Sequence, residues 1–568
     1  MRSNTSLFCL ISALAVATGA IRGDEALGEK IIRLPELAVN ETMKLRPREK
    51  WLTGQLGSFE IYSTASESET KDFATKLQKF HQTFALLFPK LIGNSGDKIT
   101  LVLCGTRDKY LALAPTDAGQ VDERYGNLAY ATLKDGFGTT FLINFDAKAF
   151  FGDGTSAGMN TGGGENAAPT MNFSQSTGAE FVDGETLLRQ QYLRLLLSRS
   201  QSRPPAWLEE GVVRYFDSLK VQKDKITFAQ LDMSLTRYFS RERLNTRRMM
   251  DMKDFFAVTY DSPEYRKVVG GTFSHQALAF VHYAMLSHKG RYRATFLKFI
   301  DQASKEPVTE TIFKNYFKMS FSDMEAVLDD YVQGGFYRHV VAPKPAELPP
   351  APPLVLRETT DAESGRIKGD VLRQVKRYED ARLELVSPLM RKQADARLLA
   401  SLGLLGYETN SLAAARKFLE EAIAAKVDNP IAYVTLARLR LEDAQHGSPE
   451  TKLTPAQLNG VLTPLFAALS QKLSHVEIYT LIADAWLCSK TAPTLDNLAI
   501  LDEGVLSFPR NADLIYKNAT LKARHGFTDD ARSLADLGLK IARDTANRNR
   551  FEQLKASLPA SQLPATKS

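Results

Sequence analysis

The sequence contains only three cysteines in 568 residues, and no two of them form a CxxC pair. Cys9 lies in an apolar run at the N-terminus, so only Cys104 and Cys488 remain in the rest of the chain. A disulfide framework or a cysteine-rich zinc module needs several closely spaced cysteines, and neither is indicated here. We therefore expect Cys104 and Cys488 to behave as small buried side chains.

Long apolar runs are also missing beyond the first 25 residues, and spanning a bilayer needs about 20 such residues. The opening segment, MRSNTSLFCLISALAVATGAIRGDE, has one Arg, an apolar run from Leu7 to Ala17 and then small residues. This order is typical of a secretory signal peptide. We predict a signal peptide over residues 1–20, with Gly23 as an alternative cleavage position. The mature chain is then exported, periplasmic or extracellular, without an integral membrane segment.

A strong charge imbalance is absent as well, since 72 Lys and Arg stand against 66 Asp and Glu, a net charge of +6. There is no dense basic tract, and RRM, zinc-knuckle and basic-zipper patterns are missing, so we expect no nucleic-acid partner. The composition, 44% hydrophobic and 24% charged, is that of a globular protein, and the length predicts several domains.

Strand and helix patterns alternate over residues 50–150, which predicts an α/β portion. Phe59–Ser63, Lys98–Cys104 and Thr139–Asp146 are rich in apolar and β-branched residues and are predicted as strands. The nearly continuous apolar run of Lys98–Cys104 indicates a strand buried on both faces. Residues 66–88 begin with Ser-rich capping residues and carry apolar positions at helical spacing, which predicts a helix.

Composition changes mark the later boundaries. Residues 151–180 are rich in Gly, Ser and Asn, carry no phosphate-loop motif, and are predicted to be a surface loop. Residues 181–336 show helical patterns, including amphipathic patterns over 272–286 and 290–303. Six prolines between Val341 and Leu356 favour extended chain, and we predict a semi-rigid linker over 341–365.

Residues 366–556 contain an internal repeat. Leu399, Leu402 and Gly403 recur as Tyr433, Leu436 and Ala437, a shift of 34 residues. Ala415 follows Gly403 by 12 positions. This spacing resembles the tetratricopeptide repeat, a helix pair in which small residues allow close packing. Two looser copies follow an interruption near residues 446–460, and an unrelated helical bundle is the alternative.

The segment Leu187–Phe216, LLRQQYLRLLLSRSQSRPPAWLEEGVVRYF, contains two predicted helices joined by a short loop. Its second part, Pro204–Phe216, resembles the P-x-W-L-x-E-G-x-A-x-Y-F segment of the peptidase-MA-like gluzincins, zinc peptidases of the thermolysin clan. The resemblance covers about residues 50–335, although only Trp207–Phe216 is specific. It implies an α+β metallopeptidase-like domain, and in that family the residue matching Glu210 is the third zinc ligand.

The preceding helix departs from that family at every chemical position. Where the family has HExxH, this chain has Gln190, Gln191, Tyr192, Leu193 and Arg194. An amide is a poor zinc ligand, a guanidinium cannot be deprotonated, and Gln cannot act as a general base. We therefore predict no metal and no cofactor, and we expect no catalytic residue.

The eight histidines of the chain include no HxxxH pair, and we interpret them as surface or boundary residues. Glu209 and Glu210 point about 100° apart on a helix, so we do not expect them to act on one centre. We hypothesise that Arg194 replaces the metal ion by pairing with Glu210. The alternative is an Arg194 side chain that points to solvent.

The predicted fold is an α+β metallopeptidase-like domain followed by an all-α tetratricopeptide-like domain. We interpret the chain as an exported, non-catalytic peptidase-like protein that binds a protein or peptide. Binding is predicted through the repeats and through a vestigial groove at Arg194, Trp207 and Glu210. The alternatives are an active zinc-independent hydrolase and an envelope scaffold protein. An open groove beside Trp207 favours binding, whereas a filled one favours the scaffold.

Overall fold

The computed structural model describes most of the chain between residues 45 and 559. The described residues are 45–87, 99–115, 130–134, 138–145, 148–151, 180–198, 204–222, 224–231, 233–239, 248–266, 271–304, 306–344, 353–445, 452–471, 475–542 and 545–559. The predicted signal peptide and residues 152–179 of the predicted glycine-rich loop lie outside this set. Among the helices described, none has the length and apolar content that a membrane crossing requires.

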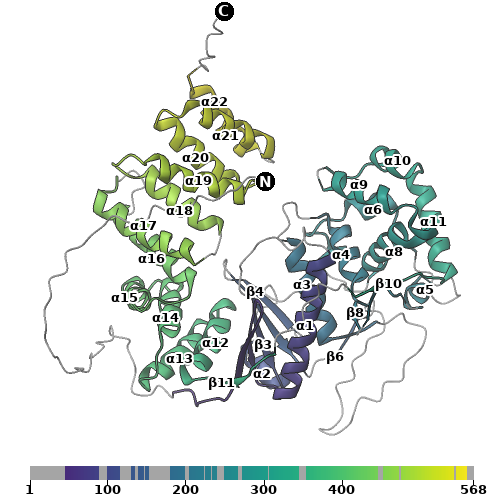
Figure 1. Ribbon diagram of the computed structural model, residues 1–568, viewed down its shortest axis with the longest axis horizontal. Helices are drawn as coiled ribbons and strands as arrows, with labels where there is room; N and C mark the ends of the chain where they lie inside the picture. Colours follow the sequence, from purple (N-terminus) through teal and green to yellow (C-terminus); the bar gives the residue numbers. More distant parts are fainter. Residues whose placement is uncertain are drawn as a thin grey trace, which may run out of the picture. The chain divides into compact units, whose positions relative to one another are not determined.

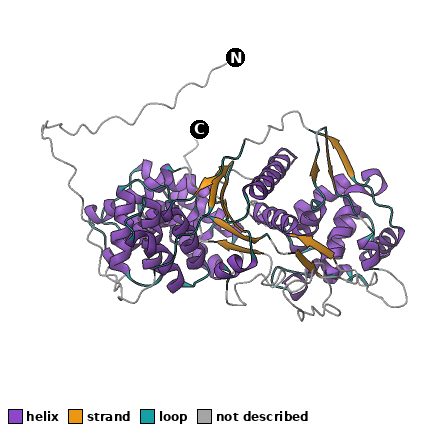
Figure 2. Cartoon of the chain, turned by 90° about the horizontal axis from the view of Figure 1, so that it is seen from below, coloured by secondary structure: helices purple, strands orange, loops and turns teal. Residues whose placement is uncertain are grey.

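A six-stranded mixed sheet has the strand order β11-β1-β2-β3-β5-β4. Figure 2 draws the strands in orange. The neighbouring strands β2, β3 and β5 are parallel, and the remaining pairs are antiparallel. These three parallel strands match the strands predicted from the apolar runs to within two residues at each end. The six strands are β1 (Leu52–Leu56), β2 (Phe59–Ser63), β3 (Ile99–Cys104), β4 (Tyr130–Lys134), β5 (Thr139–Asn144) and β11 (Arg357–Glu358).

Both faces of the central strand β3 are buried, as its continuous apolar run predicts. Leu101 packs into a core shared with helix α1 (Glu67–Leu87). Val102 points to the opposite face, because successive side chains of a strand alternate. Helices α2 (Arg107–Leu113) and α12 (Asp361–Gln374) pack on the sheet and contact each other.

A second group of elements, between residues 148 and 343, is mainly helical, as predicted. It also contains two small antiparallel sheets that the sequence did not predict. The helices are α3 (Gly184–Ser198), α4 (Ala206–Tyr215), α5 (Ser234–Tyr238), α6 (Met252–Ala257), α7 (Pro263–Arg266), α8 (Thr272–Leu286), α9 (Arg293–Ala303), α10 (Glu310–Phe317) and α11 (Phe321–Gly334). The short strands are β6 (Lys148–Phe151), β7 (Glu180–Asp183), β8 (Lys220–Val221), β9 (Lys225–Phe228) and β10 (Val340–Pro343).

Helix α8 lies at the centre of this group and is buried on nearly every side. The amphipathic pattern predicted for it is therefore wrong, since its few polar residues are also buried. Gly211 lets α4 approach α8 closely: a Cβ at this position would lie 2.4 Å from Val281 Cγ2 and 2.7 Å from the Ala277 carbonyl oxygen. The Gly that follows Glu210 is thus required by helix packing.

Eleven helices in succession form the described C-terminal part, and they pack as antiparallel pairs in a tetratricopeptide-like arrangement (Figure 1). Each pair consists of a first helix and a second helix. The first helices are α12, α14 (Ala396–Glu408), α16 (Pro430–Gln445), α18 (Val476–Leu487) and α20 (Ala512–Arg524), and α22 (Thr545–Ser557) continues this series. The second helices are α13 (Tyr378–Met390), α15 (Leu412–Ala424), α17 (Pro455–Ser470), α19 (Leu495–Ser507) and α21 (Thr528–Ile541).

The helix starts explain the repeat seen in the sequence. From Ala396 to Pro430 the offset is 34 positions, from Pro430 to Val476 it is 46, and from Val476 to Ala512 it is 36. The interruption near residues 446–460 is therefore an extension between α16 and α17 within one pair. Among the predicted packing positions, Leu399 is half-buried, and the others are buried: Leu402, Gly403, Ala415, Tyr433, Leu436 and Ala437.

The linker predicted over residues 341–365 is wrong in its later part, where the structure has a strand and the start of a helix. Arg357–Glu358 forms β11 and pairs with Leu52 and Thr53 of β1, so the chain rejoins the N-terminal sheet. Helix α12 then begins at Asp361, within the predicted linker, because Thr360 and Glu363 form a reciprocal capping box. The repeat array thus begins before residue 366.

Candidate functional site

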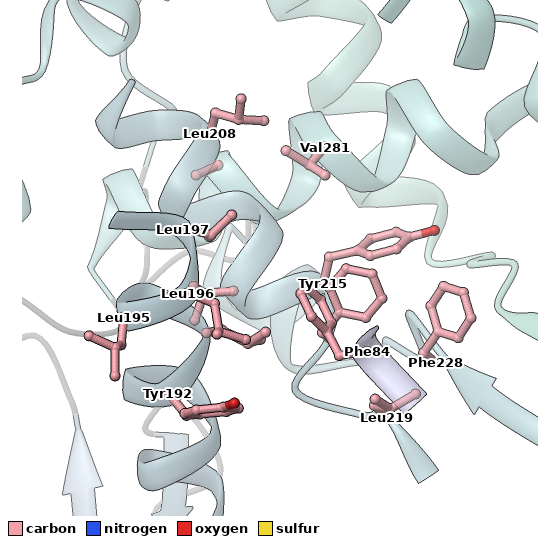
Figure 3. Packing of buried hydrophobic residues seen from close by; sticks show 14 of the residues in the cluster. Phe84, Tyr192, Leu195, Leu196, Leu197, Leu208, Tyr215, Leu219, Phe228 and Val281 are labelled. Carbon is pink, nitrogen blue, oxygen red and sulfur yellow. The ribbon is translucent and has the colours of Figure 1, made fainter. Parts of the chain in front are cut away.

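The two helices of the segment Leu187–Phe216, α3 and α4, lie side by side and run antiparallel. Gln190 on α3 donates to Asp217 just beyond α4, and Arg194, one turn further along α3, contacts Glu210 within α4. Figure 3 shows the Leu196 and Leu197 side chains of α3 on the side that faces α4. The polar side chains of the predicted site therefore extend from the same two helices into an otherwise apolar interior.

Arg194 lies between two carboxylates. Its Nη2 donates to Glu210 Oε2 at 2.6 Å, and its Nη1 lies 3.5 Å from Glu209 Oε1. The side chains of Arg194, Glu209 and Glu210 are buried, with 8%, 1% and 6% of their surfaces exposed. The Arg194–Glu210 pair that we hypothesised is present, and the alternative of an Arg194 side chain in solvent does not hold. We define Arg194, Glu209 and Glu210 as the buried ion cluster.

Three hydroxyl groups donate to the two glutamates of the buried ion cluster. Tyr265 donates to Glu209 Oε1 at 2.6 Å. The single Tyr260 hydroxyl hydrogen is shared between Glu209 Oε2 at 2.9 Å and the Pro204 carbonyl oxygen at 2.6 Å. Ser274 donates to Glu210 Oε1. The one guanidinium can balance the negative charge of only one of the two glutamates. Hydrogen bonds from the hydroxyl groups stabilise the remaining charge. Each Glu oxygen therefore accepts from a positioned donor within the protein.

Two details of this cluster were not predicted. Glu209 and Glu210 diverge along α4, yet the long Arg194 side chain contacts both. The hydroxyl donors Tyr260, Tyr265 and Ser274 lie 50 or more positions after Glu209, and sequence reasoning missed them. The sequence contains one signal for these donors: Ser274 is a polar residue within the apolar pattern of α8.

The chemistry available at the buried ion cluster is limited. Arg194 stays protonated and occupies the space between the glutamates where a cation would have to bind. Gln190 donates to Asp217 rather than turning to Glu210, and Gln191 is buried. No set of three or more His, Cys, Asp or Glu side chains in the described ranges is placed to hold a metal ion. The arrangement fits an ion pair that holds α3 and α4 together.

Trp207 lies in the core rather than in a groove. It is 0% exposed, and Phe255, Phe256, Phe280 and Phe299 surround its indole ring, with centroid distances between 5.3 and 6.3 Å. Aromatic side chains from α6, α8 and α9 thus fill the space that the predicted vestigial groove needs. The prediction that Arg194, Trp207 and Glu210 line an open groove is corrected: all three are interior side chains.

The histidines and cysteines also differ in part from expectation. His275 and His282 are buried rather than at the surface or boundary. His275 stacks on Tyr238 with ring centroids 3.8 Å apart, and burial lowers the pKa of His282 to about 4, so it is neutral. Cys104 is buried as expected, and burial raises the pKa of its thiol to about 12, whereas Cys488 is half-buried.

A second candidate site is the layer of first helices in the repeats. Each of α12, α14, α16, α18 and α20 contacts the next helix of its series, up to α22, whereas neighbouring second helices make no comparably extensive contacts within the described ranges. Closer spacing on one side curves such an array, so the first helices form its inner face. We call this layer of first helices the inner face.

Ion pairs and a hydrogen bond bridge successive helices of the inner face. Tyr407 on α14 donates to Glu442 on α16. Charged pairs join the other successive first helices. They are Arg373–Glu408, Arg438–Glu477, Lys517–Asp484 and Arg550–Asp513. Polar and charged side chains therefore continue across the repeats on one side, which is the kind of surface that can contact an extended chain.

Comparisons with known proteins give fold-level similarities only. No protein-family model matches this chain, and no curated protein matches it. One similar solved structure is YrrB, a TPR protein with an unusual peptide-binding site, at 15% identity and a TM-score of 0.29 over 34% of this chain and 92% of that one. Another is TTC0263, a thermophilic TPR protein of Thermus thermophilus, at 16% identity and a TM-score of 0.24 over 34% of this chain and 98% of that one. Yeast Tom70 aligns at 12% identity and a TM-score of 0.27 over 66% of this chain and 72% of that one.

Proposed function

We propose that this chain is a non-catalytic binding protein that recognises a segment of a partner protein on the inner face of its repeats. The observation that carries this proposal is the continuous contact between successive first helices, which brings side chains from several repeats onto one surface. Stacked helix pairs form extended concave surfaces of this kind, and such surfaces bind peptides and protein segments.

Arg438 lies at the centre of the proposed surface. It extends from α16, pairs with Glu477 on α18, and places its guanidinium 5.9 Å from the ring centroid of Tyr407 on α14. One side chain thus connects three successive first helices. Arg and Tyr are among the residues that contribute most to protein interfaces, because each combines a large contact area with hydrogen-bonding groups. We infer that Tyr407 and Arg438 form the centre of the contact.

The N-terminal part is proposed as a relative of the gluzincin peptidases that has lost the metal. The support is the sequence segment Pro204–Phe216 together with the buried ion cluster, in which Arg194 takes the place of a cation beside Glu210. Export of the chain, inferred from the first 20 residues, belongs to the same proposal. Binding through a vestigial groove is not proposed, since Trp207 is interior.

A scaffold role for the N-terminal part is favoured by how the sheet meets the repeats. Glu60 on β2 accepts from Arg397 on α14 at 2.7 Å and lies 4.0 Å from Arg366 on α12. Burial acts to raise the pKa of Glu60, but the two arginines together lower it. A charged group held in this way ties the sheet to the first two repeats, so the sheet supports one end of the array. The zinc-independent hydrolase has no comparable support.

The binding proposal predicts that charge removal on the inner face weakens peptide binding. Random peptides selected on the full chain are expected to bind an Arg438→Ala, Lys517→Ala variant at least about tenfold more weakly, the loss typical of a central Arg contact. Arg438 and Lys517 keep partly exposed side chains, so their ion pairs contribute little stability and the variant is expected to fold. Fluorescence anisotropy of a labelled selected peptide measures the change.

The matched control is Arg416→Ala, which removes an Arg of similar exposure from α15, a second helix. This variant is expected to bind the selected peptides as the unchanged protein does. Equal binding by the control and the inner-face variant would contradict the proposal. Failure of the selection to enrich any peptide would contradict it too.

A further inference from the structure

A large apolar cavity lies on the side of α4 away from the buried ion cluster. Its volume is about 430 Å³, and side chains from α3, α4, α8, α9 and β9 form its walls. None of Arg194, Glu209 or Glu210 lines it. Protein interiors seldom leave voids larger than a water molecule, whereas cavities of this size are typical of small-molecule sites.

The walls of the cavity are almost entirely hydrocarbon. Leu208 and Val212 of α4, Val281 of α8 and Phe296 and Ile300 of α9 all contribute to the lining. Figure 3 shows several of these wall residues, with the Leu208 and Val281 side chains in the upper part of the view and the Tyr215 and Phe228 rings below them. Such a lining excludes a polar or charged ligand body and fits an alkyl chain.

Two polar groups mark one part of the lining. Tyr215 is 4% exposed, and its hydroxyl group has no hydrogen-bond partner among the described residues. Figure 3 shows this hydroxyl pointing away from the leucine side chains of α3. Burial raises the pKa of Tyr215 to about 12, although the charge of nearby Arg293 opposes the rise. The hydroxyl therefore remains protonated and can donate.

Arg293, the first residue of α9, is the charged residue of the lining, and it is exposed to solvent. No carboxylate within the described ranges forms an ion pair with it; its Nε donates only a long bond of 3.4 Å to the Met285 carbonyl oxygen. Leu297, one turn later on α9, also lines the cavity and is 56% exposed. An unpaired cation beside an exposed apolar side chain is the arrangement expected at the entrance of a site for an anionic amphiphile.

We propose that this cavity binds a free long-chain alkyl carboxylate. The alkyl chain lies among Leu208, Val212 and Val281, and the carboxylate accepts hydrogen bonds from Arg293 and from the Tyr215 hydroxyl. This site is separate from the inner face of the repeats and does not depend on the function proposed there. A carboxylate fits better than an alcohol because charge-assisted hydrogen bonds to a guanidinium are stronger than neutral ones.

The test is isothermal titration of sodium dodecanoate, below its micelle-forming concentration, into the full chain. One equivalent is expected to bind, and dodecanol is expected to bind at least about tenfold more weakly, because it lacks the charge-assisted bonds. Arg293→Ala should weaken dodecanoate binding by about tenfold, and Tyr215→Phe by a smaller factor. Val212→Trp fills the cavity and should abolish binding.

The control is Arg291→Ala, which removes an exposed Arg near the start of α9 that does not line the cavity, and its dodecanoate affinity should be unchanged. Absence of dodecanoate binding by the unchanged protein would overturn the proposal. The same conclusion follows if Arg293→Ala and Arg291→Ala behave alike, or if Val212→Trp, shown to be folded by circular dichroism, still binds. Binding to phosphatidylglycerol vesicles without binding to dodecanoate would also refute it and indicate a lipid surface as the ligand.

Discussion

Replacing Arg194 with Ala is expected to lower the free energy of unfolding by about 3–5 kcal/mol, the usual cost of removing one partner of a buried ion pair. The variant leaves Glu209 and Glu210 in the interior with 1% and 4% of their surfaces exposed and without a cation. The hydroxyl donors Tyr260, Tyr265 and Ser274 cannot neutralise two carboxylates. Thermal and urea denaturation of the full chain measure the loss.

The matched control is Arg189→Ala, on the same helix. The Arg189 side chain is 18% exposed, against 8% for Arg194. Its replacement by Ala is expected to lower the free energy of unfolding by no more than about 1 kcal/mol. Combining Arg194→Met with Glu209→Gln and Glu210→Gln removes all the charges of the cluster and should recover part of the stability. An unchanged melting temperature for Arg194→Ala would show that the cluster does not hold α3 to α4.

Replacing Trp207 with Ala is expected to cost about 3–5 kcal/mol, as for other large aromatic side chains removed from a core. The indole is fully buried among phenylalanines of α6, α8 and α9, so its loss leaves a cavity that these rings cannot collapse into. Trp207→Phe should cost much less. It keeps an aromatic ring, and it removes an indole N–H that is buried without a hydrogen-bond partner among the described residues.

Leu495→Ala is a suitable control, because Leu495 is 68% exposed and its truncation should change stability by no more than about 0.5 kcal/mol. The urea concentration at half-unfolding should fall for Trp207→Ala, a buried position, and stay nearly unchanged for Leu495→Ala, an exposed one. If Trp207→Ala instead retained full stability and lost peptide binding, Trp207 would belong to an open groove and the core assignment would fail.

Local features of the fold could be predicted from local sequence. The strand Phe59–Ser63 was predicted at its observed bounds, since a short apolar run between polar residues leaves little choice. The 34-residue shift between Leu402 and Leu436 located two consecutive first helices, because each repeat must bury the same face. The start of α12 also has a local signal, because Thr360 and Glu363 form a Ser/Thr-x-x-Glu capping pattern.

Features that depend on distant segments could not be predicted. The strand β11 has two residues and pairs with β1 about 300 positions away, so no local pattern identifies it. The burial of Trp207 depends on phenylalanines from three later helices. The hydroxyls of Tyr260, Tyr265 and Ser274 are ordinary polar residues in sequence, and only the fold brings them to Glu209 and Glu210.

The family resemblance predicted one contact between α3 and α4, and another became evident only in the structure. The segment Pro204–Phe216 predicted a helix that presents Glu210 to the preceding helix, and the structure has that contact. Gln190 could not be placed by analogy, because its partner Asp217 lies beyond the motif. The proposal of a lost metal site therefore depends on Arg194, which pairs with Glu210, the residue that the resemblance implies as a zinc ligand.

The zinc content of the purified full chain, measured by elemental analysis after extensive dialysis, tests this claim most directly. A chain with Arg194 between Glu209 and Glu210 should retain far less than one equivalent, because a structural or catalytic zinc site needs at least three protein ligands. Close to one tightly held equivalent would contradict the account, since a metal would then have ligands other than those assigned, and the peptidase activity would have to be reconsidered.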